Sequence, residues 1–452
     1  MKKQKKKRQI LSVKTGTGFS LINPHAAGID IGDTEHYVAV ENGEEHEVRC
    51  FDAFTVDLRD IVQWLTSIGI TTVAMESTGI YWLPLYLMLE DAGVDVYLVN
   101  AKNTKNVTGR KKDDSDAVWI QKLHRCGLLQ KSFQPEHENR ILRNYVRQRK
   151  NLVTIGSDSV RRMQKALELM NIKVHTVISD LIGKSGMKII AAILEGERNL
   201  EVLASLCDPR IKAAKEEIIK SLEAIWSDEY LFMLKQAYEE YFFYQKQIQD
   251  CNKKIQEQLV KQVAIVKQGD ISEVPKENST KKKGKKNQFD FDVAGHFRLL
   301  TGVDLCKIPG VNEVTVVELI AEIGTDMSKW KNAKHFAAWL NLAPNTKITG
   351  GKIISSKMMK KKNKAGQTLK MSASCLARNK TPLGDYYRRM RAKLGGKGAV
   401  LATAHKLARI IFVMLKDKKE YNAEMLNESQ EKFNLKRIKH LEKQLEKLKQ
   451  VA

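Results

Sequence analysis

The sequence predicts an α/β amino-terminal domain followed by a mainly helical remainder, and three observations support this division. Short β-branched runs alternate with amphipathic helical patterns between residues 27 and 99. From about residue 136, long charged segments carry apolar residues three and four positions apart. A polar, lysine-rich stretch at residues 268–290 then separates these helices from a further helical segment. Because the chain has 452 residues, more than one domain is expected.

Six segments follow from these patterns. They are a basic tail (1–20), an α/β domain with an acidic site (21–135), a helical, coiled-coil segment (136–267), a lysine-rich linker (268–290), a carboxy-terminal domain with a hydroxyl-bearing loop (291–418) and a final helix (419–452). The final helix carries leucine or isoleucine at positions 435, 438, 441, 445 and 448, which is the spacing of a short coiled-coil stripe.

The α/β domain shows the element order βββαβαβ. The expected strands cover residues 27–31, 36–40, 48–54, 72–75 and 94–99, and the expected helices cover 56–68 and 83–89. A Gly-Asp-Thr turn joins the first two strands as a hairpin. Three antiparallel strands followed by alternating helix and strand are the layout of an RNase H/RuvC-like sheet, an order that several other α/β folds share.

The charge balance indicates a polyanionic partner. Lys and Arg total 77 against 53 acidic residues, a formal net charge of +24. Nucleic acid is the commonest such partner. A membrane surface is disfavoured because there is no run of about 18 apolar residues, and the basic start lacks a signal-peptide hydrophobic region, so we expect a cytoplasmic protein. The six single cysteines lack the spacing of a zinc site.

Four carboxylates of the α/β domain form a candidate metal site. Asp30 ends the first strand within GIDIG, where flanking glycines would let a ligand approach the backbone. Glu76 ends the fourth strand, and Asp113 and Asp116 lie where a helix should begin, on one helical face. Carboxylate oxygens suit Mg²⁺, and four of them suit a two-metal site for phosphoryl transfer. Taken singly, each is more simply explained as a turn former or a helix cap, whereas the set follows the strand order that a ribonuclease-H site requires.

Basic residues lie immediately before the last two carboxylates. The segment KNTKNVTGRKK holds cations that could bind a phosphate backbone beside the metals, namely Lys102, Lys105, Arg110, Lys111 and Lys112. A solvated basic loop is the alternative. The sequence DIGDT also fits the phosphate loop of the actin and sugar-kinase ATPase fold, but that fold needs a second copy of the strand set, which is not evident after residue 136.

Two motifs mark the carboxy-terminal domain. The sequence IPGV lies between two helical patterns and resembles a helix-hairpin-helix turn, or is an ordinary helix link. A glycine-centred loop then carries the hydroxyls of Thr349, Ser355 and Ser356 beside lysines that include Lys352 and Lys357. A positioned hydroxyl can act as a nucleophile, and cations can stabilise the charge on an attacked phosphate. By itself this is also simply a polar loop.

Taken together, these motifs resemble the insertion-sequence-110 family of transposases, which is related to the Piv/MooV site-specific DNA invertases. The Asp-Glu-Asp-Asp set, the K-x-D-x-x-D-A motif, the IPG segment and the GGK loop occur in the expected order. The segments LRNYVRQRKNLV, DLIGKSGMKIIAAILEGERN, LGDYYRRM and ATAHKLARIIFVML are also similar to that family. The resemblance covers nearly the whole chain except the tail, the linker and the final helix.

The resemblance implies a mechanism and a set of partners. It implies that Asp30, Glu76, Asp113 and Asp116 bind Mg²⁺ and that a serine of the carboxy-terminal domain forms a covalent link to DNA. Thr349 stands at the position aligned with that serine, and Ser355 and Ser356 remain alternatives. It further implies target and donor DNA, a structured bridge RNA that pairs with both, and a homodimer or homotetramer whose two domains form composite active sites.

Five arginines of the helical segment fall at helical intervals and could bind such an RNA: Arg143, Arg147, Arg149, Arg161 and Arg162. A solvated helix face is the alternative interpretation. The leading hypothesis is therefore RNA-guided, Mg²⁺-dependent DNA strand exchange that moves an insertion sequence. A structure-selective nuclease resembling a Holliday-junction resolvase and an inactive nucleic-acid-binding relative are the two other hypotheses.

Overall fold

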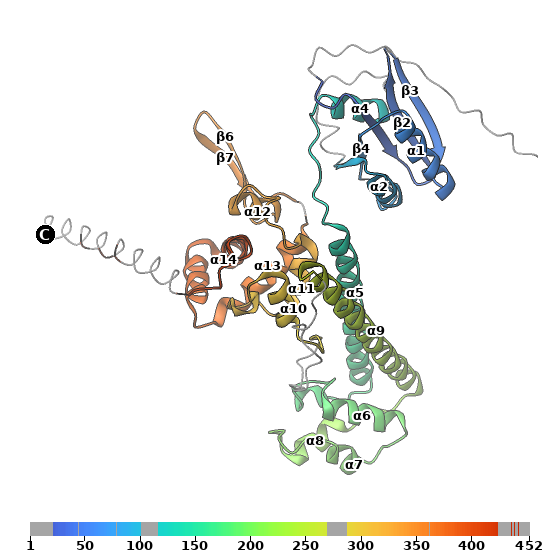
Figure 1. Ribbon diagram of the computed structural model, residues 1–452. Coiled ribbons are helices and arrows are strands. Elements are labelled where there is room, and N and C mark those ends of the chain that lie inside the picture. The colour runs from blue at the N-terminus through green and yellow to red at the C-terminus, as the bar shows by residue number, and fades with distance from the viewer. Residues whose placement is uncertain are drawn as a thin grey trace, which may run out of the picture. The chain divides into compact units, whose positions relative to one another are not determined.

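The computed structural model describes residues 21–43, 45–77, 79–100, 116–268, 287–360 and 362–423, together with the single residues 435, 438 and 442. The chain divides into two compact units, Met1–Gln134 and Pro135–Ala452, and the elements of each are labelled in Figure 1. The predicted basic tail, the segment from Lys102 to Asp113 and most of the final helix lie outside the described residues.

The amino-terminal unit is built on a five-stranded mixed sheet. Its strands are β1 (Ala26–Ile31), β2 (Glu35–Asn42), β3 (Glu45–Asp52), β4 (Thr72–Glu76) and β5 (Asp95–Val99), in the spatial order β3-β2-β1-β4-β5. β2 is antiparallel to both β1 and β3, whereas β4 and β5 run parallel to β1. The mixed α/β prediction is confirmed, and β3 begins and ends earlier in the chain than expected.

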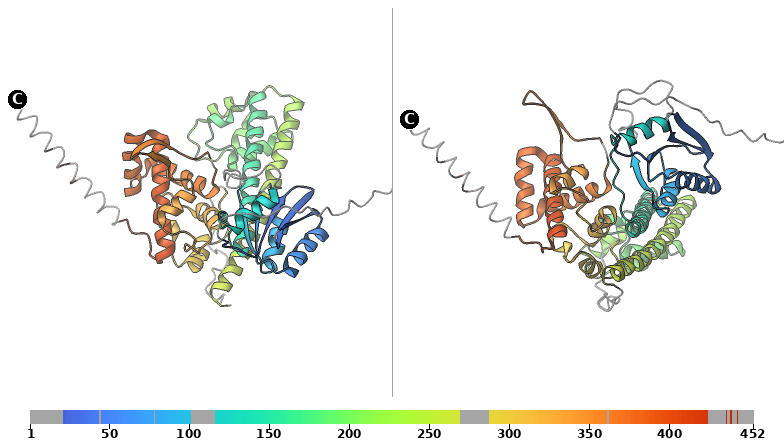
Figure 2. Two further views of the ribbon diagram at one scale, coloured as in Figure 1. Left: turned by 90° about the horizontal axis from the view of Figure 1, so that it is seen from above. Right: turned by 45° about the horizontal axis from the view of Figure 1, so that its top comes forward.

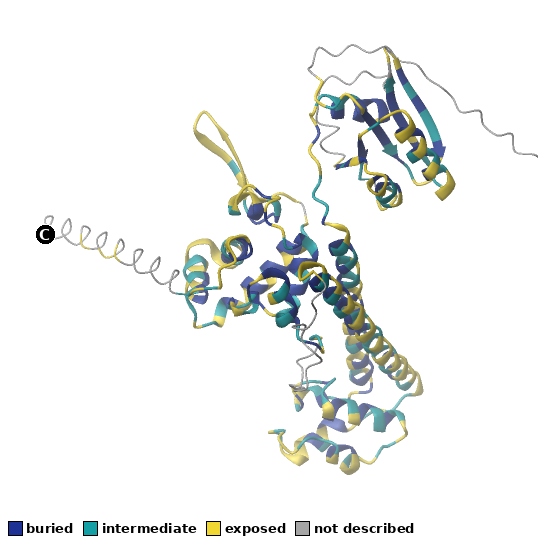
Figure 3. Cartoon of the chain, viewed as in Figure 1, coloured by how far each residue is buried: buried dark blue, intermediate teal, exposed yellow. Residues whose placement is uncertain are grey.

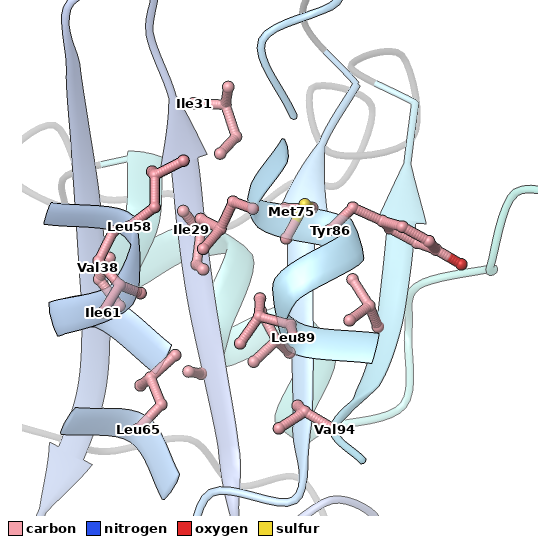
Figure 4. Close-up of a cluster of buried hydrophobic side chains, with 14 of the residues drawn as sticks. Ile29, Ile31, Val38, Leu58, Ile61, Leu65, Met75, Tyr86, Leu89 and Val94 are labelled. Atoms are coloured by element: carbon pink, nitrogen blue, oxygen red, sulfur yellow. The ribbon is translucent and has the colours of Figure 1, made fainter. Parts of the chain in front are cut away.

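Helices cover both faces of this sheet. Helices α1 (Thr55–Ser67) and α2 (Trp82–Asp91) cover one face, where Ile29 and Met75 pack with residues of both helices in one buried cluster. Figure 4 shows these side chains between the sheet and the two helices. Helix α4 (Asp116–Arg125) contacts β1, β2 and β4, and Ala74 joins a second cluster with its residues Trp119 and Ile120. Because side chains alternate along each strand, residues on the two faces of the sheet belong to two separate cores.

Gly28 sets how closely α4 approaches the sheet. A Cβ atom at this position would lie 2.3 Å from both the carbonyl oxygen of Ala117 and the amide nitrogen of Gln121. Since both are backbone atoms, the helix would have to move away to admit any side chain. The side-chain amide of Gln121 also donates to the carbonyl of Ala26 over 3.2 Å. Gly28, two residues before Asp30, therefore lets helix α4 approach the strand backbone. This corrects the expectation that the glycine lets a ligand approach there.

The second unit begins with two long antiparallel helices, α5 (His137–Leu169) and α9 (Asp228–Val266), which lie side by side in Figures 1 and 2. Polar contacts along the seam fix their register. The Arg149 Nε donates to Asn252 Oδ1 over 2.6 Å, and the side-chain amide of Gln258 donates to Glu138.

A separate hydrophobic cluster lies where α5 ends and α9 begins. Between α5 and α9 the chain forms η1 (Val174–Thr176), α6 (Lys184–Leu194), α7 (Leu200–Ser205) and α8 (Lys215–Leu222). These short helices bury Ile189, Ile193 and Leu222 against the end of α5 and the start of α9. The segment 136–267, expected to be helical and coiled-coil, therefore also has a globular end with its own core.

The end of the lysine-rich stretch packs on the helix pair. Arg149 donates to the carbonyl of Asn287 over 2.7 Å, and its guanidinium lies 4.1 Å from the ring centroid of Phe289. Asn252 donates to Asp290 over 3.2 Å. Residues 287–290 are thus held against α5 and α9, while residues 269–286 lie outside the described part of the chain.

The carboxy-terminal part of this unit is mainly helical. It comprises α10 (Val293–Thr301), η2 (Leu305–Lys307), α11 (Glu313–Ile323), α12 (Ala333–Trp339), α13 (Lys364–Cys375), η3 (Leu376–Arg378) and α14 (Pro382–Asp417). Asn312 and Asn363 cap α11 and α13 by accepting backbone amides, both over 2.9 Å. Gly310, in the predicted IPGV turn, has φ +83, and a Cβ there would lie 2.9 Å from the Ser372 carbonyl. The turn is therefore packed against α13.

The structure bears on two further expectations from the sequence, which concern apolar runs and the ATPase fold. The 36-residue helix α14 contains a window apolar enough to cross a membrane by length and composition, although the sequence showed no such run. Half of this window is buried within the protein, where Leu407 and Ile411 belong to the core, so α14 is explained as a core helix. Within the described residues, the five-stranded sheet is accompanied only by a two-stranded one, which gives no second copy for an ATPase fold.

Candidate functional site

Asp30 and Glu76 lie at the carboxyl ends of two adjacent parallel strands. The register pairs Gly28 with Ala74 and Ile29 with Met75, so Asp30 and Glu76 follow at the same level on neighbouring strands. Because Ile29 and Met75 face the α1–α2 core and side chains alternate along a strand, the two carboxylates point to the α4 face. Both residues are partly buried.

Helix α4 brings a third acidic residue to the same end of that face. The helix runs antiparallel to β1, because Ala117 packs on Gly28 while Gln121 donates to the carbonyl of Ala26. Its first residue, Asp116, is exposed and lies at the end where β1 stops. The fold therefore gathers Asp30, Glu76 and Asp116 at one edge.

The donor chemistry of this edge fits a divalent cation. Carboxylate oxygens are the ligands that Mg²⁺ and Mn²⁺ prefer, and Asp116 extends the set from the strands to the helix. Among the residues that the structure describes, no three Asp, Glu, His or Cys side chains lie close enough together to hold a metal ion. The fourth predicted ligand, Asp113, lies outside the described residues, as do Lys102, Lys105, Arg110, Lys111 and Lys112.

Tyr37 adds a residue that the sequence analysis did not single out. It is the cross-strand partner of Asp30 and therefore projects on the same face. Its hydroxyl donates to Glu35 over 3.1 Å, and contacts with Cys50 and Glu35 raise the pKa of Tyr37 to about 12. The phenol proton is therefore engaged by Glu35 on the face of the sheet that carries Asp30.

The opposite end of α4 is fixed by a buried histidine. His124 is 1% exposed, and its Nε2 lies 2.8 Å from the Thr72 hydroxyl of β4. Its ring packs on Tyr97 with centroids 4.6 Å apart. Burial lowers the pKa of His124 to about 4, against an opposing effect of Asp95. A neutral imidazole in the last turn of α4 therefore anchors the helix to β4.

The predicted hydroxyl loop is a two-stranded β-ribbon, formed by β6 (Asn345–Thr349) and β7 (Lys352–Lys357). Gly350 and Gly351 make the turn with positive φ angles of 54 and 77, as expected for a two-residue hairpin turn. Every strand residue except the partly buried Ser355 is exposed, and Figure 3 shows the ribbon in yellow over its length.

Strand alternation sorts the three candidate nucleophiles onto two faces. Thr349 pairs with Lys352, and Lys347 pairs with Ser355, so these four residues share what we call the lysine face. Ser356 pairs with Thr346 on the opposite face, where the two hydroxyl oxygens are 3.2 Å apart. Thr349 and Ser355 therefore have lysine neighbours, whereas Ser356 is paired with a hydroxyl.

The five arginines proposed for RNA binding occupy different environments. Arg149 is buried and held by Asn252 and Phe289, as described above. Arg147 donates to both carboxylate oxygens of Glu322 in α11, over 2.7 and 2.8 Å. Burial lowers the pKa of Arg143. Arg161 and Arg162 are the more exposed members, and they pair with Asp158 and Glu240 respectively.

Two family models match separate segments of the sequence. Residues 27–172 match a model described as a transposase, of the IS110 type with a DEDD acidic set. Residues 304–388 match a model described as a transposase of the IS116/IS110/IS902 family. The first match spans the acidic edge and all of α5, and the second spans the ribbon. No curated protein matches the chain.

The buried histidine generates a prediction about pH. In the unfolded chain His124 titrates near 6.5 and in the folded protein near 4, so only the unfolded state takes up this proton between those values. The stability of the amino-terminal unit should therefore fall by about 1.4 kcal/mol per pH unit as the pH drops through this window. Urea unfolding measured across the window would show this slope.

A matched pair of variants assigns the slope. His124→Gln should flatten it, and the residual slope comes in part from His36, whose pKa is also lowered by burial. His25→Gln changes an exposed histidine of the same unit and should leave the slope intact. Equal slopes in both variants would show that His124 does not provide it.

Proposed function

The chain belongs to the IS110 family of transposases, and from this membership we propose that it moves an insertion sequence by RNA-guided, metal-dependent exchange of DNA strands. The family implies an enzyme that cuts and rejoins DNA. The observation that carries the proposed chemistry is the gathering of Asp30, Glu76 and Asp116 at one edge, with Asp30 and Glu76 adjacent in register. The sheet order β3-β2-β1-β4-β5 with α4 across it supports a RuvC-like assignment.

In this proposal Asp30, Glu76 and Asp116, with Asp113 as the fourth ligand, would close around Mg²⁺ on binding, since no three of the described acidic side chains lie close enough to share an ion in this structure. The bound ions would supply charge neutralisation at the attacked phosphate and lower the pKa of an attacking hydroxyl. The chain's own contribution is geometric: β1 and β4 fix two carboxylates, and the packing of α4 on Gly28 sets the position of the third. The basic segment before Asp113 would hold the phosphate backbone through Lys102, Lys105, Arg110, Lys111 and Lys112.

The second half of the proposed chemistry lies on the ribbon. Thr349 attacks a DNA phosphate through its hydroxyl oxygen, forming an ester to the protein and releasing the other DNA oxygen, which leaves with a proton. Lys347 and Lys352 stabilise the developing negative charge, because they share a face with Thr349. Ser355 is the alternative nucleophile on the same face. Lys357, at the root of β7, contacts the phosphate backbone further along.

A structured RNA and a second protomer complete the proposal. The excess of 24 positive charges supports a large nucleic-acid partner, and Arg161 and Arg162 offer exposed guanidinium groups on α5. Arg143, Arg147 and Arg149 would act by holding α5 against its neighbours. The long α5–α9 pair is proposed to act as a coiled coil, the protein to work as a homodimer or homotetramer, and the reaction to take place in the cytoplasm.

Replacing the acidic residues tests the metal site. We expect Asp30→Asn, Glu76→Gln and Asp116→Asn each to lower the rate of strand cleavage at least about a hundredfold, because a lost ligand removes transition-state charge stabilisation. DNA affinity should change little. Cleavage of duplexes from the ends of the insertion sequence, with Mg²⁺ or Mn²⁺ added, measures the rate. Asp91→Asn, an exposed carboxylate at the end of α2, is the control, and equal rates in all four variants would rule out the site.

Replacing the hydroxyls identifies the nucleophile. Thr349→Ala should abolish the covalent protein–DNA adduct, and Thr349→Ser should retain it, because serine keeps the attacking oxygen. Ser356→Ala should behave as the unchanged protein, since Ser356 lies on the opposite face. Denaturing gels of protein with end-labelled DNA detect the adduct. An adduct that survives Thr349→Ala but not Ser355→Ala would transfer the role to Ser355.

Sequencing the RNA that copurifies with the protein tests the guide. The proposal expects one dominant structured RNA, encoded beside the gene of this protein, with segments complementary to target and donor DNA. Protein purified in the presence of unrelated cellular RNA gives the background. A pool of RNAs that matches the cell's bulk composition would contradict guidance and would leave a transposase that acts without it.

A further inference from the structure

The ribbon exposes three isoleucines that the proposed chemistry does not use. Ile348, Ile353 and Ile354 are 61%, 66% and 68% exposed, and all three lie next to the turn. Single exposed apolar residues are common on protein surfaces. These three isoleucines lie together near the end of a thin ribbon, and no described element covers them. Such a cluster indicates a surface that contacts another molecule.

The arrangement of the strands gives the ribbon two different faces. Ile348 pairs with Ile353 on the face opposite Thr349 and Lys352, and a register shift beside Ile348 makes Ile354 the extra residue of a bulge. We call this the isoleucine face. The ribbon is thus apolar on one side of its tip and cationic on the other.

The tip itself is small, and the root is fixed. Gly350 and Gly351 carry no side chains, and a Cβ at either would meet nothing within 4 Å. At the root, the side-chain amide of Asn341 donates to the carbonyl of Met359, and that of Asn363 donates to the carbonyl of Trp339, each over 3.1 Å. The ribbon is therefore a narrow arm with a defined base, whose tip can approach a partner closely.

Charge identifies the partner as a polyanion. From Met327 to Gly384 the sequence contains 13 Lys and Arg residues and no Asp or Glu. A protein surface that docks apolar residues usually includes charges of both signs at its rim, whereas a purely cationic surround suits phosphates on either side. Two-stranded ribbons enter DNA grooves, and isoleucine is among the side chains that insert between base steps.

We propose that the ribbon is a wedge that enters a DNA duplex tip first, so that the lysine face holds the phosphates of one strand while Ile348 and Ile353 cover an unstacked base. The inference rests on the proposed function, since it makes DNA the partner of this arm. Burial of the isoleucines offsets the cost of unstacking. The wedge would open the duplex where a strand must leave its partner.

Unstacking can be measured apart from cleavage. The probe is a duplex with a fluorescent adenine analogue whose emission rises when the base leaves the stack. We expect a rise on saturation with the full-length protein, and a loss of about half or more of that rise with the double substitution Ile348→Ser and Ile353→Ser. Ile225→Ser, which changes an isoleucine that is 74% exposed elsewhere in the same unit, should leave the rise unchanged.

Two further variants separate this inference from the proposed nucleophile. Thr349→Ala should keep the emission rise while losing the covalent adduct. The double substitution Lys347→Gln and Lys352→Gln should weaken DNA binding and reduce its salt dependence. At saturating protein, the emission should still rise as it does with the unchanged protein. If the adduct fails to form in the unchanged protein while the rise persists, the nucleophile assignment is wrong and the wedge stands.

The double isoleucine variant also provides the result that would refute the wedge. Because the isoleucines are exposed, the double variant should melt at the temperature of the unchanged protein, so a loss of signal cannot come from unfolding. An unchanged emission rise in the double variant would refute the proposal. A changed oligomeric state in sedimentation, with the rise intact, would instead assign the isoleucine face to a second copy of the chain.

Discussion

The close contact between α4 and β1 is the constraint on which the acidic edge depends. Gly28 lets two backbone atoms of α4 come within the space of one side chain, and Gln121 fixes the position of the helix along the strand. Asp116 is then placed by core packing, although it is itself exposed. Since a packed core has few alternative arrangements, the packing fixes the acidic residue of the helix relative to the acidic residues of the strands.

Polar contacts between α5 and α9 fix the register of these two helices. Long amphipathic helices can slide along one another because apolar contacts have little directionality. Arg149 prevents this, since its guanidinium binds Asn252 of the partner helix and the carbonyl of Asn287 at the same time. The buried arginine thus ties together three segments that are distant in sequence. Its contribution is specificity of register as well as stability.

The sequence predicted the amino-terminal elements well because their periodicities are local. It placed Asp30 and Glu76 at strand ends for the same reason. It misassigned Gly28, since a glycine reveals that something approaches the backbone but not what does. It also offered the arginines of α5 to RNA, with a solvated face as the alternative, whereas Arg147 pairs with Glu322, a residue 175 positions away. No window of local sequence contains such a partner. It interpreted the Gly-Gly segment as a polar loop, whereas the structure has a two-stranded ribbon whose alternation is interrupted by the bulge at Ile354.

The exposure of the ribbon has an evolutionary consequence. Its strand side chains, apart from Ser355, contribute little to the core, and its root is tied through Asn341 and Asn363, which lie outside the two strands. Substitutions along the arm therefore carry almost no penalty in folding. In a transposase that spreads between genomes, most of these exposed positions can therefore change one at a time while the scaffold stays constant.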